Sequence, residues 1–261
     1  MSPRLIAVWV FAVVVSITSS ASALSQETGF LNRSLTIGDV VYRYQVYLPQ
    51  DWTGDKAWPV ILFLHGAGER GRDGLRQTQV GLGAAIRLEE ERFPFVVVMP
   101  QCPKEKWWTD PEMQREALSA LDAAMKEFHG DPSRLYLTGL SMGGYGTWYI
   151  AASNPGKFAA LVTICGGVVP PSGHPQPIAL GPDPYADLAK KIGSTPVWIF
   201  HGSSDPVVLP SESRNMAYAL RKTGGNVRLT EYWGVGHDSW DKAYAESELP
   251  QWLLSHTLTK E

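Results

Sequence analysis

The stretch RLYLTGLSMGGYGTWYIAAS, residues 134–153, decides how the chain folds around it. An apolar run, a glycine-rich turn and a helical pattern follow one another, as in a turn that cradles a phosphate or one that exposes a nucleophile. Gly139, Ser141 and Gly143 match G-x-S-x-G, whereas neither G-x-x-x-x-G-K-[ST] nor G-x-G-x-x-G occurs at this turn. The spacing therefore predicts that Ser141 is a nucleophile on a strained strand-to-helix turn.

Strand and helix patterns alternate along the chain on both sides of this turn. Most of the apolar runs are short and do not alternate with polar residues, as expected of strands that are covered on both faces. The predicted strands are Val40–Leu48, Pro59–Leu64, Pro94–Met99, Arg134–Thr138, Ala160–Ile164, Val197–Phe200 and Val227–Trp233, and the predicted helices are Leu75–Arg92, 109–129, 142–153, Glu212–Lys222 and Asp241–His256, the last interrupted by Pro250. The fold class is therefore α/β, with a mainly parallel sheet and helices on both faces.

Two local patterns refine this prediction. Thr109 precedes Glu112 by three residues and Pro111 lies between them, which predicts a capping box at the start of a helix. Residues 166–196 are rich in proline and are expected to be irregular. This excursion is too short for a lid domain, and we expect it to border the site.

Composition and the first residues bear on location and partners. Arg4, an apolar stretch over residues 5–17 and small residues up to Ala23 predict a signal peptide over residues 1–23, so that residues 24–261 form a single catalytic domain of a secreted or periplasmic protein. Without Arg4, 22 basic residues stand against 26 acidic ones, a formal charge of −4. This balance argues against a nucleic-acid partner, and no second apolar stretch predicts a membrane span after signal cleavage.

A serine nucleophile needs a base that is oriented by an acid, and in this kind of sheet they follow in the order Ser, Asp or Glu, His. Asp205 lies in IFHGSSDPVV, directly after a buried strand, and His237 lies in GVGHDSW, after the next one. Both are therefore expected at the carboxyl edge of the sheet, beside Ser141. Taken singly, Asp205 could cap a turn and His237 could be an ordinary loop histidine, but the order of all three favours a catalytic triad.

A fourth feature is His65-Gly66-Ala67-Gly68, directly after the apolar run PVILFL. A loop of this type supplies one backbone N–H to an oxyanion hole, and the residue after the nucleophile supplies the other. The predicted donors are Met142 together with either Ala67 or Gly68. His65 precedes the nucleophile and so stands outside the triad order, which favours a structural role for it.

These motifs resemble those of the α/β-hydrolases, and more narrowly the single-domain secreted esterases of the phospholipase/carboxylesterase, dienelactone-hydrolase-like or predicted-peptidase type. The similar stretches are FLHGAGERG (63–71), MPQCP (99–103), DPSRLYLTGLSMGGYGTW (131–148), IFHGSSDPVV (199–208) and GVGHDSWDKAY (234–244). The resemblance implies an α/β-hydrolase fold without a large lid domain, ester hydrolysis without a cofactor, and Ser141, Asp205 and His237 as the triad.

The two cysteines, Cys102 and Cys165, are expected to be free thiols. In the fold that the resemblance implies, their strands are separated by the strands that lead to His65 and Ser141. Three steps of about 4.8 Å place them roughly 14 Å apart, beyond the span of about 7 Å that a disulfide allows. No Cys/His cluster has the spacing of a zinc site, so we predict no metal.

Aromatic residues near the motifs are the candidates for substrate contact. Trp107 and Trp108 follow MPQCP, Tyr145 lies at the turn after Ser141, and Trp240 lies three residues past His237. They could line an acyl or alcohol pocket, or stack on a sugar or aromatic ring. Core packing is an equally good interpretation of each tryptophan, and Tyr145 could pack beneath the site.

The predicted activity is that of a serine carboxylesterase that forms an acyl-enzyme. Its partner would be a small-molecule or polysaccharide-linked ester with a short-chain, aromatic or carbohydrate component. Two alternatives are a serine peptidase with the same triad, and a non-catalytic carbohydrate-binding module that uses the tryptophans. The sequence gives no indication of oligomeric state.

Overall fold

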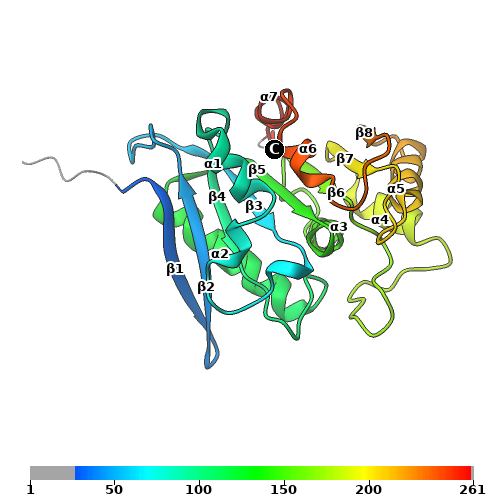
Figure 1. Cartoon of the computed structure of the whole chain (residues 1–261), viewed down its shortest axis with the longest axis horizontal. Helices are drawn as coiled ribbons and strands as arrows, with labels where there is room; N and C mark the ends of the chain where they lie inside the picture. The colour runs from blue at the N-terminus through cyan, green and yellow to red at the C-terminus, as the bar shows by residue number, and fades with distance from the viewer. Residues whose placement is uncertain (1–26, 260–261) are drawn as a thin grey trace, which may run out of the picture.

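The computed structural model describes residues 27–259 (Figure 1). Eight strands form one sheet in the order β1-β2-β4-β3-β5-β6-β7-β8. The strands are β1 Gly29–Ile37, β2 Val40–Leu48, β3 Trp58–Leu64, β4 Val96–Pro100, β5 Gly130–Leu140, β6 Ala160–Ile164, β7 Val197–Gly202 and β8 Val227–Tyr232. All neighbouring pairs from β4 to β8 are parallel, and only β1–β2 and β2–β4 are antiparallel. The prediction of a mainly parallel sheet is confirmed.

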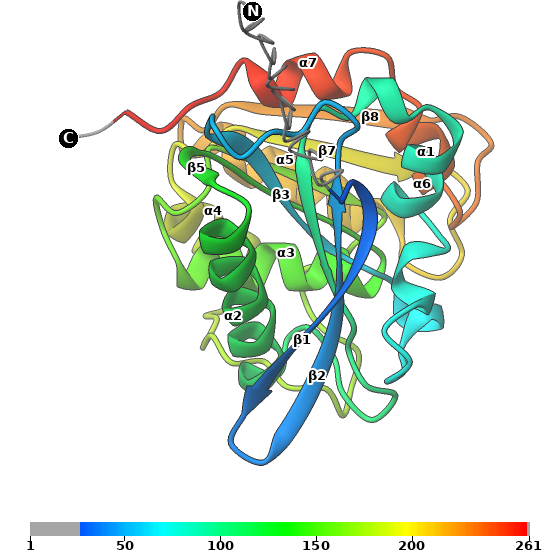
Figure 2. The same ribbon diagram turned by 90° about the vertical axis from the view of Figure 1, so that its left-hand side faces the viewer.

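Helices cover both faces of this sheet, as predicted. They are α1 Leu82–Leu88, α2 Pro111–Glu127, α3 Met142–Ser153, α4 Pro184–Ile192, α5 Pro210–Lys222, α6 Trp240–Tyr244 and α7 Leu249–Leu254. Buried residues of α2, α3, α4 and α5 share one apolar cluster, and those of α1, α6 and α7 share another. Figure 2 shows α2 and α3 on one side of the sheet and α1, α6 and α7 on the other. The sheet thus has a core on each face.

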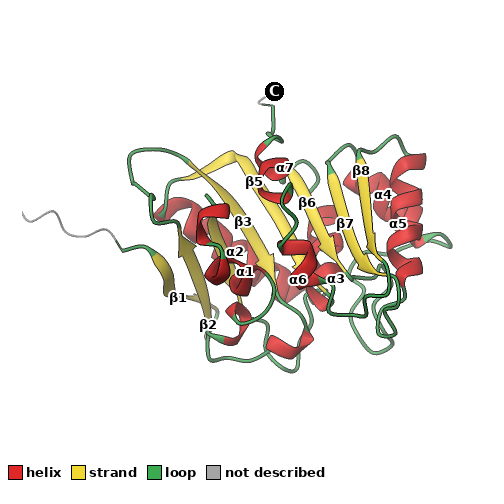
Figure 3. Ribbon diagram, turned by 45° about the horizontal axis from the view of Figure 1, so that its top comes forward, coloured by secondary structure: helices red, strands yellow, loops and turns green. Residues whose placement is uncertain are grey.

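The central position of α3 follows from its sequence. Every residue from Met142 to Ala152 is buried, because the helix packs on the middle of the sheet beneath its neighbours. It contacts β3, β5 and β6 on the sheet and α4 beside it. Figure 3 shows the parallel strands fanned across the molecule, with β5 in the interior. The turn between β5 and α3 is therefore held from several sides.

Several predicted elements differ from the structure. The helix predicted over Leu75–Arg92 is shorter, because only Leu82–Leu88 is α-helical and short 3-10 turns lie on either side of it. The C-terminal helical segment is divided into α6 and α7, and Pro250 lies in the first turn of α7, where a missing N–H costs nothing. Residues 166–196 are not irregular throughout, since α4 lies within them.

The predicted capping box is wrong. The residue before α2 is Asp110, and its carboxylate accepts a hydrogen bond from the backbone N–H of Trp107 at 2.8 Å. The Thr109 hydroxyl is buried without a hydrogen-bond partner. The predicted start and end of the helix are nevertheless correct to within two residues.

The N-terminal strand β1 has no counterpart in the prediction. Its exposure alternates along the strand, and it pairs with β2 through a tight turn at residues 38–39, where Gly38 has a φ of +60°. Gly38 suits that turn because glycine tolerates a positive φ. The hairpin lies at the edge of the sheet that is farther from β7 and β8 (Figure 1).

Both cysteines are buried free thiols, as predicted. Cys102 follows β4 and Cys165 follows β6, and the intervening strands β3 and β5 keep them apart. The predicted signal peptide over residues 1–23 lies outside the described residues and stays a prediction. Within residues 27–259, no helix is long and apolar enough to cross a bilayer.

Candidate active site

Ser141 lies on a strained turn between β5 and α3. Its φ is +52° and its ψ is −117°, a conformation that is rare for a residue with a side chain. The turn persists because its surroundings hold it, and the backbone N–H of Ser141 donates to the carbonyl of Ile164 at 2.8 Å. This strain is of the kind that clusters at functional sites.

The glycines around Ser141 allow close backbone approach. A Cβ at Gly143 would lie 2.0 Å from the Leu64 carbonyl oxygen, and one at Gly139 would lie 2.3 Å from the Gly143 carbonyl oxygen. Both neighbours are backbone atoms, which cannot move aside easily. The first turn of α3 can therefore sit against the ends of β3 and β5 only because Gly143 and Gly139 lack a side chain.

The structure brings Ser141, His237 and Asp205 into one hydrogen-bonded chain. Ser141 Oγ lies 2.8 Å from His237 Nε2, and His237 Nδ1 lies 2.7 Å from Asp205 Oδ2. Ser141 and His237 are half-buried, whereas the Asp205 side chain is fully buried. The loops after β5, β7 and β8 supply the three residues, at the carboxyl edge of the parallel strands, where the sequence places them.

Asp205 receives more hydrogen bonds than a turn-capping role requires. Its Oδ1 accepts from the backbone N–H groups of Val207 and Val208, at 2.8 and 3.0 Å. Its Oδ2 lies against two histidine rings, that of His237 and that of the buried His201, whose Nε2 is 3.1 Å away. His201 was not among the predicted site residues, although it lies four positions before Asp205 in the quoted stretch IFHGSSDPVV.

The predicted oxyanion donors lie around the same nucleophile. Met142 is the first residue of α3, and Ala67 and Gly68 begin a 3-10 helix after β3, so their N–H groups belong to helix starts that lack internal acceptors. A Cβ at Gly66 would lie 3.7 Å from Ser141 Cβ, which places this loop directly against the serine. The geometry is compatible with either Ala67 or Gly68 as the second donor.

His65 has a structural role, as the triad order predicts. Its Nε2 accepts from the backbone N–H of Cys102 at 3.0 Å and its Nδ1 lies 2.6 Å from the Gly66 carbonyl, so Nδ1 carries the proton. Burial lowers the pKa of His65 to about 4, and the ring is therefore neutral at pH 7. It ties the loop after β3 to the loop after β4.

Two of the predicted substrate-contacting aromatics are partly exposed, and one of them, Trp240, borders the triad. The Trp240 ring meets the His237 ring edge to face, with centroids 5.6 Å apart. Trp107 is half-buried, stacks on His174 at 3.9 Å and meets the Tyr145 ring at 5.8 Å. His174 comes from the irregular part of residues 166–196, so that excursion does lie beside Trp107.

The other two predicted aromatics are packed inside the protein. Trp108 is 0% exposed and its Nε1 donates to the His65 carbonyl at 2.9 Å, so its prediction as a pocket residue is wrong. A fully buried indole stabilises the loop at His65 and cannot contact a substrate. Tyr145 is 6% exposed and its hydroxyl lies against Gly167, so the residue is packed beneath the surface.

A thiol lies behind the triad. The Sγ of Cys165, an oxygen of Asp205 and a ring nitrogen of His237 lie within 4.8 Å of one another. Burial raises the pKa of the Cys165 thiol to about 12, so the thiol is protonated and a poor metal ligand or nucleophile at neutral pH. The hydrogen bonds to Ser141 and Asp205 already account for both His237 nitrogens.

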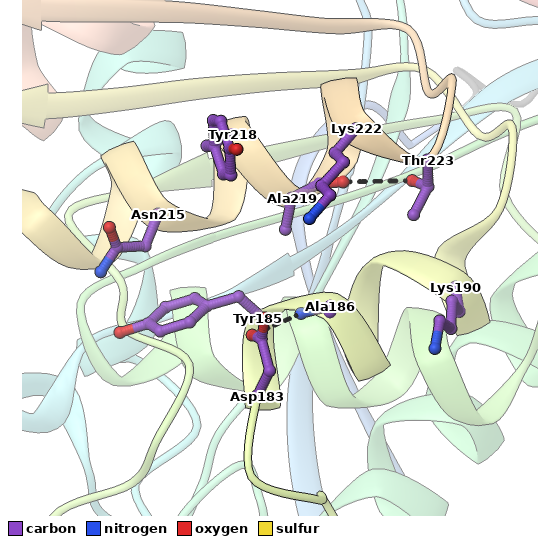
Figure 4. A pocket seen from close by; sticks show the side chains of 9 residues that line it. All are labelled: Asp183, Tyr185, Ala186, Lys190, Asn215, Tyr218, Ala219, Lys222 and Thr223. Carbon is purple, nitrogen blue, oxygen red and sulfur yellow. Dashed lines mark hydrogen bonds between the residues drawn. The ribbon is translucent and has the colours of Figure 1, made fainter.

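A groove of about 460 Å³ lies elsewhere, between α4 and α5 (Figure 4). Its lining residues are Asp183, Tyr185, Ala186, Lys190, Asn215, Tyr218, Ala219, Lys222 and Thr223. None of the predicted site residues is among them. Tyr185, which lines the groove, donates its hydroxyl to Glu212 of α5 at 2.8 Å.

Comparison with known proteins assigns the chain to a family. The model of the family described as "Putative esterase" matches residues 39–205, which include Ser141 and Asp205. The chain belongs to that esterase family. It is a carboxylic ester hydrolase with the α/β-hydrolase fold, so the interpretation as a non-catalytic carbohydrate-binding module is wrong.

Individual relatives agree with this membership. The chain is 28% identical over 219 residues to the poly(3-hydroxyoctanoate) depolymerase of Pseudomonas fluorescens, covering 76% of this chain and 74% of the relative. It is 25% identical over 221 residues to acetylxylan esterase A of Emericella nidulans, covering 72% and 67%. The crystal structure of a thermostable esterase superposes with a TM-score of 0.75 and 30% identity over 87% of this chain, which spans 63% of that esterase.

Proposed function

We propose that the chain is a serine esterase in which Ser141 is the nucleophile, His237 the general base and Asp205 the acid that orients His237. The observation that carries this proposal is the chain of hydrogen bonds from Ser141 Oγ through both His237 nitrogens to Asp205 Oδ2, at 2.8 and 2.7 Å. The carboxylate can only accept, so His237 Nδ1 bears a proton. Its Nε2 is then free to accept the proton of Ser141.

The reaction proceeds in two halves. Ser141 Oγ attacks the ester carbonyl carbon while its proton passes to His237 Nε2. The tetrahedral intermediate collapses, the bond to the alcohol oxygen breaks, and His237 returns the proton to the leaving alcohol. Water then attacks the acyl-enzyme with His237 again as base, which releases the carboxylic acid and restores Ser141.

The oxyanion of each tetrahedral intermediate would be bound by backbone N–H groups. Met142, at the start of α3, and Ala67 or Gly68, at the start of the 3-10 helix, would be the donors. The start of α3 also presents its positive end to the developing negative charge. Because these groups are fixed by the fold, they need little rearrangement during the reaction.

Trp107 and Trp240 support a substrate with a short acyl group on an aromatic, carbohydrate or polyester component. Both rings are partly exposed, and Trp240 lies against the catalytic histidine. The relatives named above act on a polyester and on acetylxylan. Export through the signal peptide predicted over residues 1–23 would bring the enzyme to such extracellular polymers.

Replacement of the nucleophile is the most direct test. We expect Ser141→Ala to lower kcat for p-nitrophenyl acetate by at least about 10⁴-fold and to abolish labelling by a fluorophosphonate. Ser255→Ala is the matched control, since Ser255 Oγ lies at the end of α7, where its hydrogen-bond partners are the Trp252 carbonyl and the His256 ring. Near-normal turnover by Ser141→Ala would overturn the proposal.

A substrate panel separates the remaining candidates. Rates on p-nitrophenyl esters of increasing chain length, feruloyl esters, acetylated xylan and a soluble hydroxyalkanoate oligomer would be compared with rates on aminoacyl and peptidyl amides. We expect the esters to be preferred. A preference for the amides would instead favour the serine peptidase with the same triad.

A further inference from the structure

A second histidine holds the catalytic acid. His201 is the fifth residue of β7 and is fully buried. Its Nε2 lies 3.1 Å from Asp205 Oδ2 and 2.9 Å from the Val208 carbonyl oxygen, and its Nδ1 lies 2.6 Å from Ser213 Oγ on α5. The His201 ring, carried by β7, therefore contacts both the loop that holds Asp205 and helix α5, which follows that loop.

These partners determine where the proton of His201 lies. A backbone carbonyl can only accept, so the contact with Val208 places a hydrogen on Nε2. Burial lowers the pKa of His201, which keeps the ring neutral at pH 7 and leaves Nδ1 without a hydrogen. Ser213 must then donate its hydroxyl hydrogen to Nδ1.

It follows that two histidine N–H groups reach one carboxylate oxygen, and that the Nε2–H of His201 is shared between Asp205 Oδ2 and the Val208 carbonyl. Asp205 Oδ2 accepts from His237 Nδ1 and from His201 Nε2, while Oδ1 accepts from two backbone N–H groups. With Oδ1 held by the backbone, rotation of the carboxylate would move mainly Oδ2. His201 supplies the contact that opposes this rotation.

We propose that His201 is a positioning residue for the esterase reaction: its Nε2–H holds Asp205 Oδ2 in line with His237 Nδ1, and Ser213 fixes the ring that does so. The inference rests on the triad of the proposed function. His201 is not an alternative general base, because it is fully buried and it is His237 that contacts Ser141 Oγ.

Few charged groups of the described residues act on His201. Asp205 and His237 face it from the loops after β7 and β8, and Glu231 of β8 acts on it from the neighbouring strand. Glu231 is bound by Arg214, at 2.8 Å from its Nε, so its charge is largely satisfied outside the site. Changes at His201 should therefore be felt mainly by Asp205 and His237.

Two polar replacements separate positioning from packing. In His201→Gln the amide nitrogen reaches the position of Nε2 and can still donate to Asp205, whereas in His201→Asn the shorter amide reaches only toward Ser213. We expect His201→Asn to lower kcat about 10- to 100-fold with little change in KM, the range for loss of a hydrogen bond to a charged group. His201→Gln should stay within a few-fold of the wild type, and both variants should lose similar Tm.

The pH profile gives a second readout. Without its second donor, Asp205 Oδ2 would interact more strongly with protonated His237, so the acid limb of the kcat/KM profile should move to higher pH in His201→Asn and return in His201→Gln. Ser213→Ala, which leaves the contact with Asp205 intact, should cost only a few-fold in kcat. Equal losses in the Asn and Gln variants, or an acid limb unchanged in both, would overturn the inference.

Fluorophosphonate labelling separates this inference from the proposed function. If the wild-type protein is not labelled at Ser141, the triad itself is wrong. If the wild type is labelled and His201→Asn is labelled at the same rate, the triad stands and the positioning role of His201 is wrong. If labelling is slower in His201→Asn and its rate is restored in His201→Gln, both the triad and the positioning role of His201 are supported.

Discussion

Two loops of the molecule begin with the same dipeptide and use it differently. His65-Gly66 follows β3 and leads into the oxyanion loop, and His201-Gly202 ends β7 and leads to Asp205. Both histidines are fully buried and both have a lowered pKa because of that burial. They carry their single proton on opposite nitrogens, Nδ1 in His65 and Nε2 in His201, because their partners differ.

The difference shows what a histidine at the end of a buried strand can do. His65 bonds only backbone groups and so places the amides of its loop. His201 bonds a backbone carbonyl and a carboxylate, and so places a side chain that enters the proposed reaction. The same residue type therefore stabilises either half of the site, and the loop that it holds decides which half.

We expect Gly202→Ala to displace the loop that carries Asp205. Its effect on activity should be larger than that of Gly66→Ala or His65→Gln. A Cβ at Gly202 would lie 2.1 Å from the Gly236 carbonyl oxygen and 2.4 Å from that of Val235, both in the backbone just before His237. Since backbone must shift, we expect kcat to fall by about 100-fold or more, the effect of a displacement near 1 Å. Measured kcat and Tm would test this, with Gly181→Ala as a control, since a Cβ there would approach only the movable Asp187 carboxylate, at 3.0 Å.

Gly66→Ala should have a smaller effect on the oxyanion loop. The nearest atom to its Cβ would be Leu140 Cδ1 at 2.8 Å, the end of a side chain that can rotate, followed by Glu69 Oε2 at 3.1 Å. We expect kcat to fall roughly tenfold, because partial displacement weakens one of the two oxyanion donors. A loss greater than that of Gly202→Ala would contradict the ranking of the two loops.

His65→Gln should have the smallest effect on activity at neutral pH. Its effect should instead be seen in how the free energy of unfolding depends on pH below 7. The pKa of folded His65 is about 4 against an ordinary 6.5, so the unfolded chain binds more protons between these values, and stability falls as the pH drops from 6.5 to 4. Its contribution is at most about 3 kcal/mol. Unfolding by urea from pH 7 to 4 should show a shallower decline of stability in His65→Gln, which keeps the contributions of the other shifted groups, His201 among them. An unchanged slope would rule out His65 as a source of the decline.

The parts of the site that sequence predicted are those governed by local and topological rules. The turn at Ser141 depends on glycines next to it in sequence, and Asp205 and His237 follow from the order of loops at one sheet edge. His201 was missed because its importance comes from Ser213 and Val208, which a tertiary contact brings to it. Its signal in the sequence was a histidine at the end of a buried strand, four residues before the acid.

The errors in the fold have similar causes. Thr109 has a capping spacing, but the loop after Trp107 turns so that Asp110 takes that position and Thr109 is buried. Trp108 lies next to Trp107 in sequence, yet its indole reaches the His65 carbonyl in the core. Strand β1 and helix α4 were missed because β1 is half exposed at the sheet edge and α4 lies within a proline-rich segment.

The state of the two cysteines makes the protein suitable for site-directed attachment. Cys102 and Cys165 are the only cysteines of the sequence, both are fully buried, and burial raises the pKa of each thiol. A single added cysteine would therefore be the one thiol that reacts with a maleimide. Leu88 is 83% exposed at the end of α1, so Leu88→Cys would give a single reactive thiol through which the esterase could be anchored to a support.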